Sequence, residues 1–380
     1  MLLPSLTEFN SGRFFAIIMA GLLLFLGVFR IPVEPMPVLF QIMFETAISI
    51  ALVSAIILRG NIFVGLFFAT AVYSMFIMSG MGTYFTFQGI FYGSVWYLIV
   101  VSFFREKHLN YLMNIICIIA IASMFWMGLQ LYNLDPLYKP MNPALWGGRQ
   151  IPTGLMLSRF SVAGLFVFCM PAFLRGYWHF WLIPLIVFII PTDCKAGYIA
   201  IAAGLYFYLF LLARKYLWIG RKRFFRSSYF ITGGGMFAYF LVSKGAASFY
   251  ARWDVWKQAY HLIKTKLLTG AGISHWTLIA DNPYGNKFIY STEGKWWFMH
   301  NDFWQAGFDM GIWFLIVCAG FYIHAYRKYH DRAMISYIAL GSMTVFTMAW
   351  FPFHNPITAS IGITWLAILH IQQKNKEGLK

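Results

Sequence analysis

Residues 109–132 read LNYLMNIICIIAIASMFWMGLQLY and carry no charged side chain. A helix needs about 20 apolar residues to cross the roughly 30 Å hydrocarbon core of a bilayer. The bilayer core offers no water to the backbone, so a segment that crosses it must satisfy its own N–H and C=O groups, as an α-helix does. This stretch therefore predicts a transmembrane helix.

Similar apolar stretches recur from end to end of the 380-residue chain. The chain is 60% hydrophobic and 11% charged, whereas a soluble domain carries about 25% charged residues and needs them to cover its surface. The sequence thus predicts an all-α, polytopic integral membrane protein in which residues 1–380 form a single membrane domain. We predict about twelve spans, at 14–30, 38–58, 62–80, 86–104, 109–132, 155–174, 177–192, 196–213, 228–243, 303–326, 333–351 and 356–373.

The distribution of basic residues predicts the orientation. Lys and Arg number 29 against 13 Asp and Glu, a formal net charge of +16, and cytoplasmic loops of membrane proteins are enriched in Lys and Arg. If the N-terminus is cytoplasmic, the dense basic clusters of the short loops all fall on the cytoplasmic side, including 105–107, 214–226, 327–332 and 374–380. We therefore expect both termini in the cytoplasm, the lipid bilayer as a partner, and no nucleic acid.

The cysteines predict neither a disulfide framework nor a zinc site. The four of them are scattered, at Cys117, Cys169, Cys194 and Cys318, and none forms a CxxC pair. No cluster of His and carboxylate residues has a spacing suited to metal binding, so we expect no metal and no other cofactor. The apolar stretch at 14–29 is not followed by a small-residue cleavage site, and we expect a retained span rather than a signal peptide.

Two long segments, 133–154 and 244–302, fall on the outer side in this topology. Segment 244–302, between spans nine and ten, is the longest, and its many Trp and Tyr residues argue against disorder. Within it, 248–264 (SFYARWDVWKQAYHLIK) has apolar residues at spacings of three and four, which predicts an amphipathic helix lying at the membrane interface. Its expected aromatic face comprises Phe249, Trp253, Trp256, Tyr260 and Ile263, and its basic residues are Arg252, Lys257, His261 and Lys264. An interfacial anchor without chemistry explains the aromatic face equally well.

Ionisable residues within spans are costly and indicate function. Glu45 falls in the second span, and four others fall at or near the outer side: Arg159, Asp193, Lys195 and Asp309. Basic residues are also dense on this side, at Arg149, Arg159, Lys195, Arg252, Lys257, Lys264 and Lys266, where the cytoplasmic bias does not explain them. Arg and Lys bind phosphate, so the pattern predicts a site for a lipid phosphate or diphosphate. General attraction to anionic headgroups is the alternative.

The stretch 299–314 reads MHNDFWQAGFDMGIWF and opens the tenth span. Asp302 is expected to cap this helix, with Gln305 completing a box-like pair. His300 and Asn301 then lie just before a helix N-terminus, where partial positive charge favours a neutral imidazole, the form that a general base needs. A histidine in an interfacial capping motif, without chemistry, is the alternative.

These residues resemble the O-antigen ligase and polymerase superfamily, whose motif is His, then Asn, Ser or Gln, then nine residues and Gly. His300, Asn301 and Gly311 have this spacing, and the motif closes a long loop and opens a span. Upstream, RWDVWKQAYHLIKTKLLTGAGISHW resembles a family stretch through Arg252, Trp256, Gly270 and Gly272. The segment PTDCKAGY carries Lys195 where the family has Arg, which keeps the charge but loses bidentate phosphate binding. Arg159, in GLMLSRFSVAG, is a looser match.

The resemblance implies a metal-independent, inverting glycosyltransferase of the bacterial inner membrane, active on the periplasmic side. The donor would be a glycan on polyprenyl (undecaprenyl) diphosphate, and the acceptor lipid A-core, another glycan or a protein, as in lipopolysaccharide biosynthesis. His300 and Asn301 would be catalytic, Arg252, Lys195 and Arg159 would bind the diphosphate, and Asp302, Asp309 and Trp256 would support them. A flippase or exporter of lipid-linked glycan, a protein O-oligosaccharyltransferase and an assembly scaffold are the alternatives.

Overall fold

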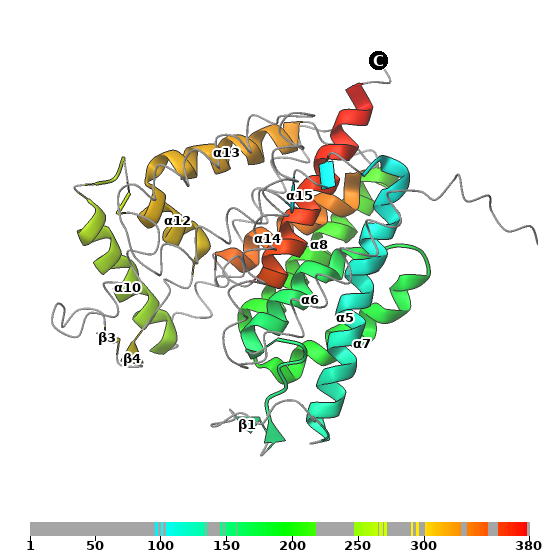
Figure 1. Cartoon of the computed structure of the whole chain (residues 1–380), viewed down its shortest axis with the longest axis horizontal. Coiled ribbons are helices and arrows are strands. Elements are labelled where there is room, and N and C mark those ends of the chain that lie inside the picture. Colours follow the sequence, from blue (N-terminus) through cyan, green and yellow to red (C-terminus); the bar gives the residue numbers. More distant parts are fainter. Residues whose placement is uncertain are drawn as a thin grey trace, which may run out of the picture.

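The computed structural model is almost entirely helical in the part of the chain that it describes (Figure 1). That part comprises residues 96–97, 100–101, 104–132, 134, 145–146, 149–156, 158–217, 247–264, 266–268, 270–271, 290–291, 294–295, 301–327, 333–348 and 356–377. The predicted spans 14–30, 38–58, 62–80 and 228–243, most of 86–104, and the residues Glu45, Gly272 and His300 lie outside it.

Five helices form the bundle at the centre of Figure 1. Helix α14 packs on α8 and α6, while α15 packs on α6 and α5. The bounds are Leu109–Leu131 for α5, Arg159–Phe173 for α6, Lys195–Leu217 for α8, Met334–Thr347 for α14 and Pro356–Glu377 for α15. Helices were predicted at all five places.

Long-range hydrogen bonds from tryptophan tie the bundle together. The indole N–H of Trp365 in α15 donates to the carbonyl of Phe168 in α6 at 2.8 Å, and that of Trp96 donates to Thr364 Oγ1 at 2.7 Å. Trp365 and Phe168 are fully buried within one continuous apolar core. A buried indole needs such an acceptor, because an unpaired N–H in an apolar core is costly.

Helices α6, α8 and α15 run in one direction and α5 and α14 in the other, which gives the bundle two distinct ends. Phe346, late in α14, lies against Gly164, early in α6. We call the end that holds Arg159 and Lys195 the Lys195 end. At the opposite end, the guanidinium of Arg175 donates to Asn110 Oδ1 at 3.0 Å and to Asn114 Oδ1 at 2.6 Å. Arg159, Asp193 and Lys195, three of the four residues predicted to share the outer side, lie at one end of the bundle.

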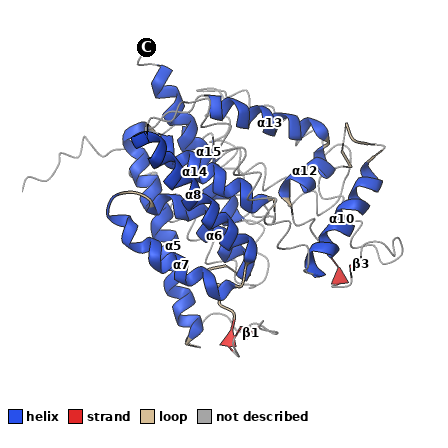
Figure 2. Cartoon of the chain, turned by 180° about the vertical axis from the view of Figure 1, so that it is seen from behind, coloured by secondary structure: helices blue, strands red, loops and turns tan. Residues whose placement is uncertain are grey.

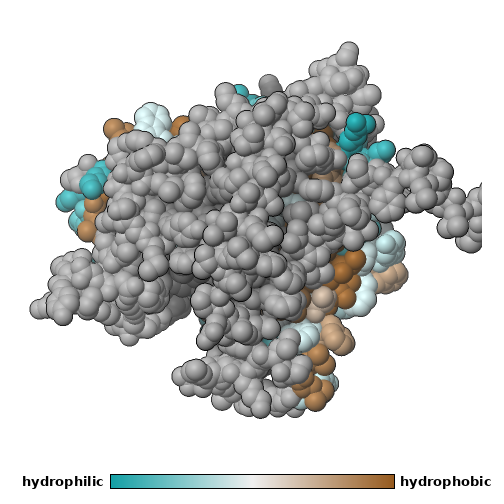
Figure 3. All heavy atoms as spheres, viewed as in Figure 1, coloured by the Kyte–Doolittle hydropathy of each residue, from teal (hydrophilic) through white to brown (hydrophobic). Residues whose placement is uncertain are grey.

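Two helical segments of the described chain are long and apolar enough to cross a bilayer, Glu106–Leu131 and Lys195–Ala213. In the most apolar 18-residue stretch of the first segment 50% is buried, and in the corresponding stretch of the second segment 39% is buried. Much of the remainder is exposed and apolar, including Ile118 and Phe125 on α5 and Leu209 on α8. Figure 3 shows hydrophobic side chains at the surface on the side where α5 and α7 lie. Shorter apolar helices are Arg159–Phe173, Gly176–Thr192, Ile312–Ala325 and Met334–Thr347.

The expected continuous helix over 303–326 is wrong, because it is divided at Gly311. Helix α12 spans Asp302–Met310 and α13 spans Ile312–Arg327. Figures 1 and 2 show the two helices running in different directions. Segment 177–192 is likewise composite, with the 3-10 helix η3 (Gly176–Trp181), helix α7 (Leu182–Ile189) and the 3-10 helix η4 (Ile190–Thr192).

The segments between the bundle helices also contain regular structure. Helix α10 spans Ala247–Ile263, where an amphipathic helix was predicted, and it contacts α12. Two antiparallel two-residue pairs accompany it: β1 (Leu145–Trp146) with β2 (Arg149–Gln150), and β3 (Tyr290–Ser291) with β4 (Gly294–Lys295). Another 3-10 turn, η2 (Glu106–His108), precedes α5.

Candidate functional site

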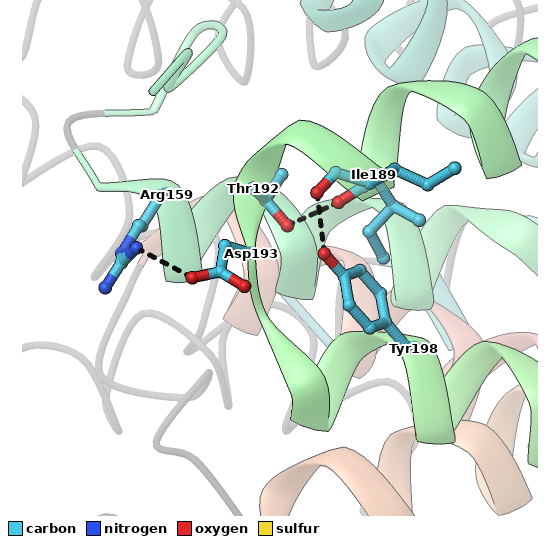
Figure 4. A network of polar contacts seen from close by, with 6 residues as sticks. Arg159, Ile189, Thr192, Asp193 and Tyr198 are labelled. Carbon is cyan, nitrogen blue, oxygen red and sulfur yellow. Dashed lines mark hydrogen bonds and ion pairs between the residues drawn. The ribbon is translucent and has the colours of Figure 1, made fainter. Parts of the chain in front are cut away.

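Three of the ionisable residues singled out in the sequence meet at the Lys195 end of the bundle. Arg159 is the first residue of α6, and Lys195 is the first residue of α8. Asp193 lies between η4 and α8, and its Oδ2 is 3.6 Å from Arg159 Nη1 (Figure 4). The first turns of α6 and α8 add partial positive charge to this end, because helix N-termini expose backbone N–H groups.

The turn that carries Asp193 is held by a small hydrogen-bond network. Thr192 Oγ1 donates to the carbonyl of Ile189 at 2.6 Å, and the Tyr198 hydroxyl donates to that of Ile190 at 2.6 Å (Figure 4). The backbone N–H of Asp193 donates to the same Ile190 carbonyl at 3.1 Å. Asp193 adopts a left-handed conformation with φ 48° and ψ 36°. The network therefore fixes the backbone at Asp193, from which the carboxylate reaches Arg159.

Buried polar side chains of α5 fix the loop that leads to Arg159. Gln130 Oε1 accepts from the backbone N–H groups of Thr153 and Gly154, each at 2.8 Å, and Ser123 Oγ accepts from that of Leu155 at 3.3 Å. The sequence analysis did not single out Gln130 or Ser123. The sequence does contain a signal for both residues. Each is a polar residue within a mainly apolar predicted span, and such residues need a hydrogen-bond partner there.

Arg252 lies on the inner face of α10, contrary to expectation. The buried residues of this helix are Val255, Ala259 and Ile263, which follow half-buried Arg252 at spacings of three and four. Trp253 and Tyr260, expected on the same face as Ile263, are exposed. The predicted stripe is thus divided between two faces, with Trp253 and Tyr260 on the exposed one and Ile263 on the buried one. The predicted face follows apolarity alone. Ala259 is less apolar than the aromatic residues, but its small side chain permits close packing, and it lies on the buried face.

The environment of Cys194 places Arg252 near the other two basic residues. Burial raises the pKa of the Cys194 thiol to about 11, while the backbone N–H of Gly197 and the charges of Arg252 and Arg159 act in the opposite direction. Both guanidinium groups therefore lie near one buried thiol, which directly precedes Lys195 in the chain. That Arg159, Lys195 and Arg252 together bind a diphosphate stays a prediction.

Asn301 caps α12, a role that the sequence analysis wrongly gave to Asp302. The backbone N–H of Trp304 donates to Asn301 Oδ1 at 3.0 Å, and Asn301 Nδ2 donates to the carbonyl of Met348, just after α14, at 2.9 Å. An aspartate at this place could accept from Trp304 but could not donate to Met348. Asp302 is the first residue of α12, and His300 directly precedes the cap but lies outside the described residues.

Asp309 is buried in α12 and does not form part of an exposed anion site. Gln305 Nε2 donates to Asp309 Oδ2 at 3.1 Å. Gln305 was expected to complete a capping box with Asp302, so its actual partner corrects that interpretation. The pair is one helical turn long and lies on the inward side of the helix, where both residues are buried.

Three indole rings join α10 and α12 and form what we call the tryptophan surface: Trp253, Trp256 and Trp304. Trp256 is stacked on Trp304 with a centroid distance of 6.4 Å and an interplanar angle of 16°. Trp253 meets Trp256 edge-on at 6.4 Å, and Lys257 Nζ lies 5.7 Å from the centre of the Trp253 ring. Trp253 and Trp304 are 42% and 38% exposed, so the surface is open to a ligand.

Gly270, in the turn after α10, and Gly311, between α12 and α13, are in contact. Gly270 and Gly311 have positive φ angles of 77° and 79°. The N–H of Ala271 donates to the Phe308 carbonyl at 2.8 Å, and that of Ile312 donates to the Leu267 carbonyl at 2.8 Å. A Cβ on Gly311 would meet the carbonyl oxygen of Leu268 and lie 2.8 Å from the nitrogen of Gly270. We call this crossing the glycine clasp; it fixes the turn after α10 against the break between α12 and α13.

Among the described residues, no group of three or more His, Cys, Asp or Glu side chains is placed to hold a metal ion. Comparison of the chain with protein-family models, with curated proteins and with solved structures finds no match.

Proposed function

We propose that this chain is an inner-membrane glycan transferase of the O-antigen ligase and polymerase type. It would move a saccharide from a polyprenyl diphosphate carrier to an acceptor hydroxyl at the periplasmic face. The observation that carries the proposal is that the charges of Arg159 and Arg252, from two separate helices, both act on the thiol of Cys194, the residue before Lys195. Three cations at one end of an apolar bundle suit a diphosphate whose prenyl chain lies in lipid.

The basic cluster would bind the diphosphate and stabilise the leaving group. When the anomeric C–O bond breaks, its electron pair passes to the phosphate oxygen, which gains negative charge. Cations already in place stabilise that charge without reorganisation. The N-terminal N–H groups of α6 and α8 would add to this effect because helix N-termini attract anions.

The N-terminus of α12 would supply the acceptor side of the reaction. Asn301 contacts the end of α14, and α14 packs on α6 and α8, so α12 begins at the same end of the bundle as the basic cluster. His300, next to the cap, would take the proton of the acceptor hydroxyl as its oxygen attacks the anomeric carbon. Asn301 would orient the acceptor chiefly through the helix that it caps, since both ends of its amide are already engaged by the protein.

The tryptophan surface would contact the sugars. Indole rings stack on the apolar faces of pyranose rings, and Trp304 stands one turn from Asn301 on the exposed side of α12. The acceptor, whether lipid A-core, glycan or protein, would be chosen by residues that the basic cluster does not include. Exposed apolar side chains on α5 and α8 would face lipid.

A transfer assay with purified protein tests this function. The native lipid-linked donor and its acceptor are incubated in detergent, and released polyprenyl diphosphate is measured. We expect turnover by wild type and none by His300→Ala. Exposed His179, whose Nδ1 lies 2.6 Å from the Gly176 carbonyl on η3, is a matched control, and His179→Ala should remain active.

The controls separate the alternatives. His300→Ala should be recovered from membranes in wild-type amounts, because the proposal gives His300 a chemical role and no structural one. Full activity of His300→Ala would remove this residue from the mechanism. If wild type leaves the donor intact but moves it across the bilayer of proteoliposomes, the chain is a lipid-linked glycan flippase.

A further inference from the structure

We propose that Asp193 is an internal anion that competes with the donor's phosphate for Arg159 and thereby sets the affinity of the diphosphate site. This inference rests on the proposed function, since it assumes that Arg159 is a phosphate ligand. It assigns a role to a residue that the sequence pattern did not include among the binding groups.

The geometry of the ion pair is that of a displaceable contact. Asp193 Oδ2 lies 3.6 Å from Arg159 Nη1, whereas a charge-assisted hydrogen bond measures about 2.7–2.9 Å. The two side chains are 51% and 30% exposed, so solvent screens their attraction. A phosphate group can bind the guanidinium bidentately through two oxygens, and the diphosphate as a whole carries more charge than the carboxylate. It should therefore displace Asp193.

The backbone keeps the carboxylate close to the site after displacement. The turn is held by the hydrogen bonds of Thr192 and Tyr198 to the carbonyls of Ile189 and Ile190, and it fixes the Cα of Asp193 (Figure 4). The side chain can rotate away from Arg159 but cannot leave the neighbourhood. A bound phosphate would then feel a like charge, which weakens its binding and favours release of the diphosphate product.

Four charged residues lie at or beside Cys194 and Asp193 in the described part of the chain. They are Arg159 on α6, Arg252 on α10, Asp193 itself and Lys195, which follows Cys194 at the start of α8. Asp193 is the one carboxylate in this set of described residues, so its removal raises the formal charge of the set from +2 to +3. We expect that change to tighten the binding of any small polyanion.

The left-handed backbone at Asp193 permits substitutions that remove the charge and keep the turn. Asparagine and glycine both tolerate positive φ, so Asp193→Asn and Asp193→Gly remove the charge without straining the turn. Two neutral variants of different size guard against an effect of shape. Glu106→Gln, on exposed Glu106 at the other end of the bundle, is the matched control for loss of a negative charge.

The test measures inorganic pyrophosphate binding to the full chain in detergent by isothermal titration calorimetry. We expect both Asp193 variants to lower the Kd about threefold to tenfold, a change typical of one like charge removed near an exposed site. Arg159→Gln should raise the Kd. In the Arg159→Gln background, Asp193→Asn should change the Kd much less, because the competition needs Arg159. Glu106→Gln should leave the Kd unchanged.

The outcomes separate the inference from the function on which it rests. If wild type binds pyrophosphate and the Asp193 variants bind it equally or more weakly, Asp193 orients Arg159 and the competition is refuted. If neither wild type nor the Asp193 variants bind pyrophosphate, the diphosphate site itself is refuted. Tighter binding by both Asp193 variants, lost in the Arg159→Gln background, supports the inference.

Discussion

Lys195 departs from the arginine expected at its place, and the structure suggests why a lysine can serve there. It is exposed and opens α8, where the N-terminus of the helix already contributes partial positive charge. A point charge that adds to this field is then sufficient to attract a phosphate. We expect Lys195→Arg to keep the KM for the lipid-linked donor within about threefold of wild type, and Lys195→Met to raise it at least tenfold. Initial rates against donor concentration give both values, and an inactive arginine variant would imply a role specific to lysine.

The choice between adjacent residues is where the sequence was least informative. Asn301 and Asp302 are both good helix caps, and the local pattern does not distinguish them. The deciding partner is the Met348 carbonyl, 47 residues away, which needs a donor that only the amide has. The pairing of Arg159 with Asp193 was equally hidden, although both residues had been placed on the same side.

At the scale of elements, the glycine clasp explains why Gly311 follows the His-Asn pair at its particular spacing. Helix α12 fills the interval from the cap at Asn301 to the crossing with Gly270. Gly311→Ala should reduce the free energy of unfolding by about 2–4 kcal/mol, from left-handed strain and collision with the backbone of Leu268. Gly320→Ala is the matched control, because Gly320 lies within α13 with nothing within 4 Å of an added Cβ, and it should stabilise by about 0.5–1 kcal/mol.

Thermal unfolding of the purified variants in detergent measures these differences. Gly270→Ala should resemble Gly311→Ala, since its Cβ would lie 2.6 Å from the nitrogen of Gly311. Equal stability of Gly311→Ala and wild type would mean that the two segments do not cross as described. Loss of the proposed transfer activity in a clasp variant that remains folded would show that the clasp also positions the residues proposed to be catalytic.

Helix positions were predictable from the sequence where one local property determines them. Uninterrupted apolarity located α5, α6, α8, α14 and α15 to within a few residues. The break at Gly311 was not predictable, because the segment 303–326 has the length and mainly apolar composition of one span, whereas the partner at the break is the remote Gly270. The inner face of α10 was missed for a related reason, since aromatic residues outweigh alanine in any apolarity pattern, yet Ala259 packs more closely.

For the whole molecule, the packing of the helices shows which of their ends lie together. The helices that begin at the Lys195 end include α6, α8 and α15, and each was predicted to start on the outer side. That these ends face outward stays a prediction, because packing alone does not orient the bundle in a bilayer. Which end faces the periplasm depends on the bilayer, so the charge pattern alone predicts it.

Labelling of single introduced cysteines decides that orientation. Lys266 lies before the glycine clasp and Arg327 ends α13, whose 16 residues span about 24 Å, and both side chains are exposed. In intact spheroplasts, Lys266→Cys should react with a membrane-impermeant maleimide, whereas Arg327→Cys should react only after permeabilisation. The native cysteines are mostly buried, and the unsubstituted chain provides the background signal. Reversed labelling would place the basic cluster in the cytoplasm and remove periplasmic transfer from consideration. Equal labelling of both positions without permeabilisation would show that α13 does not separate two sides of a membrane.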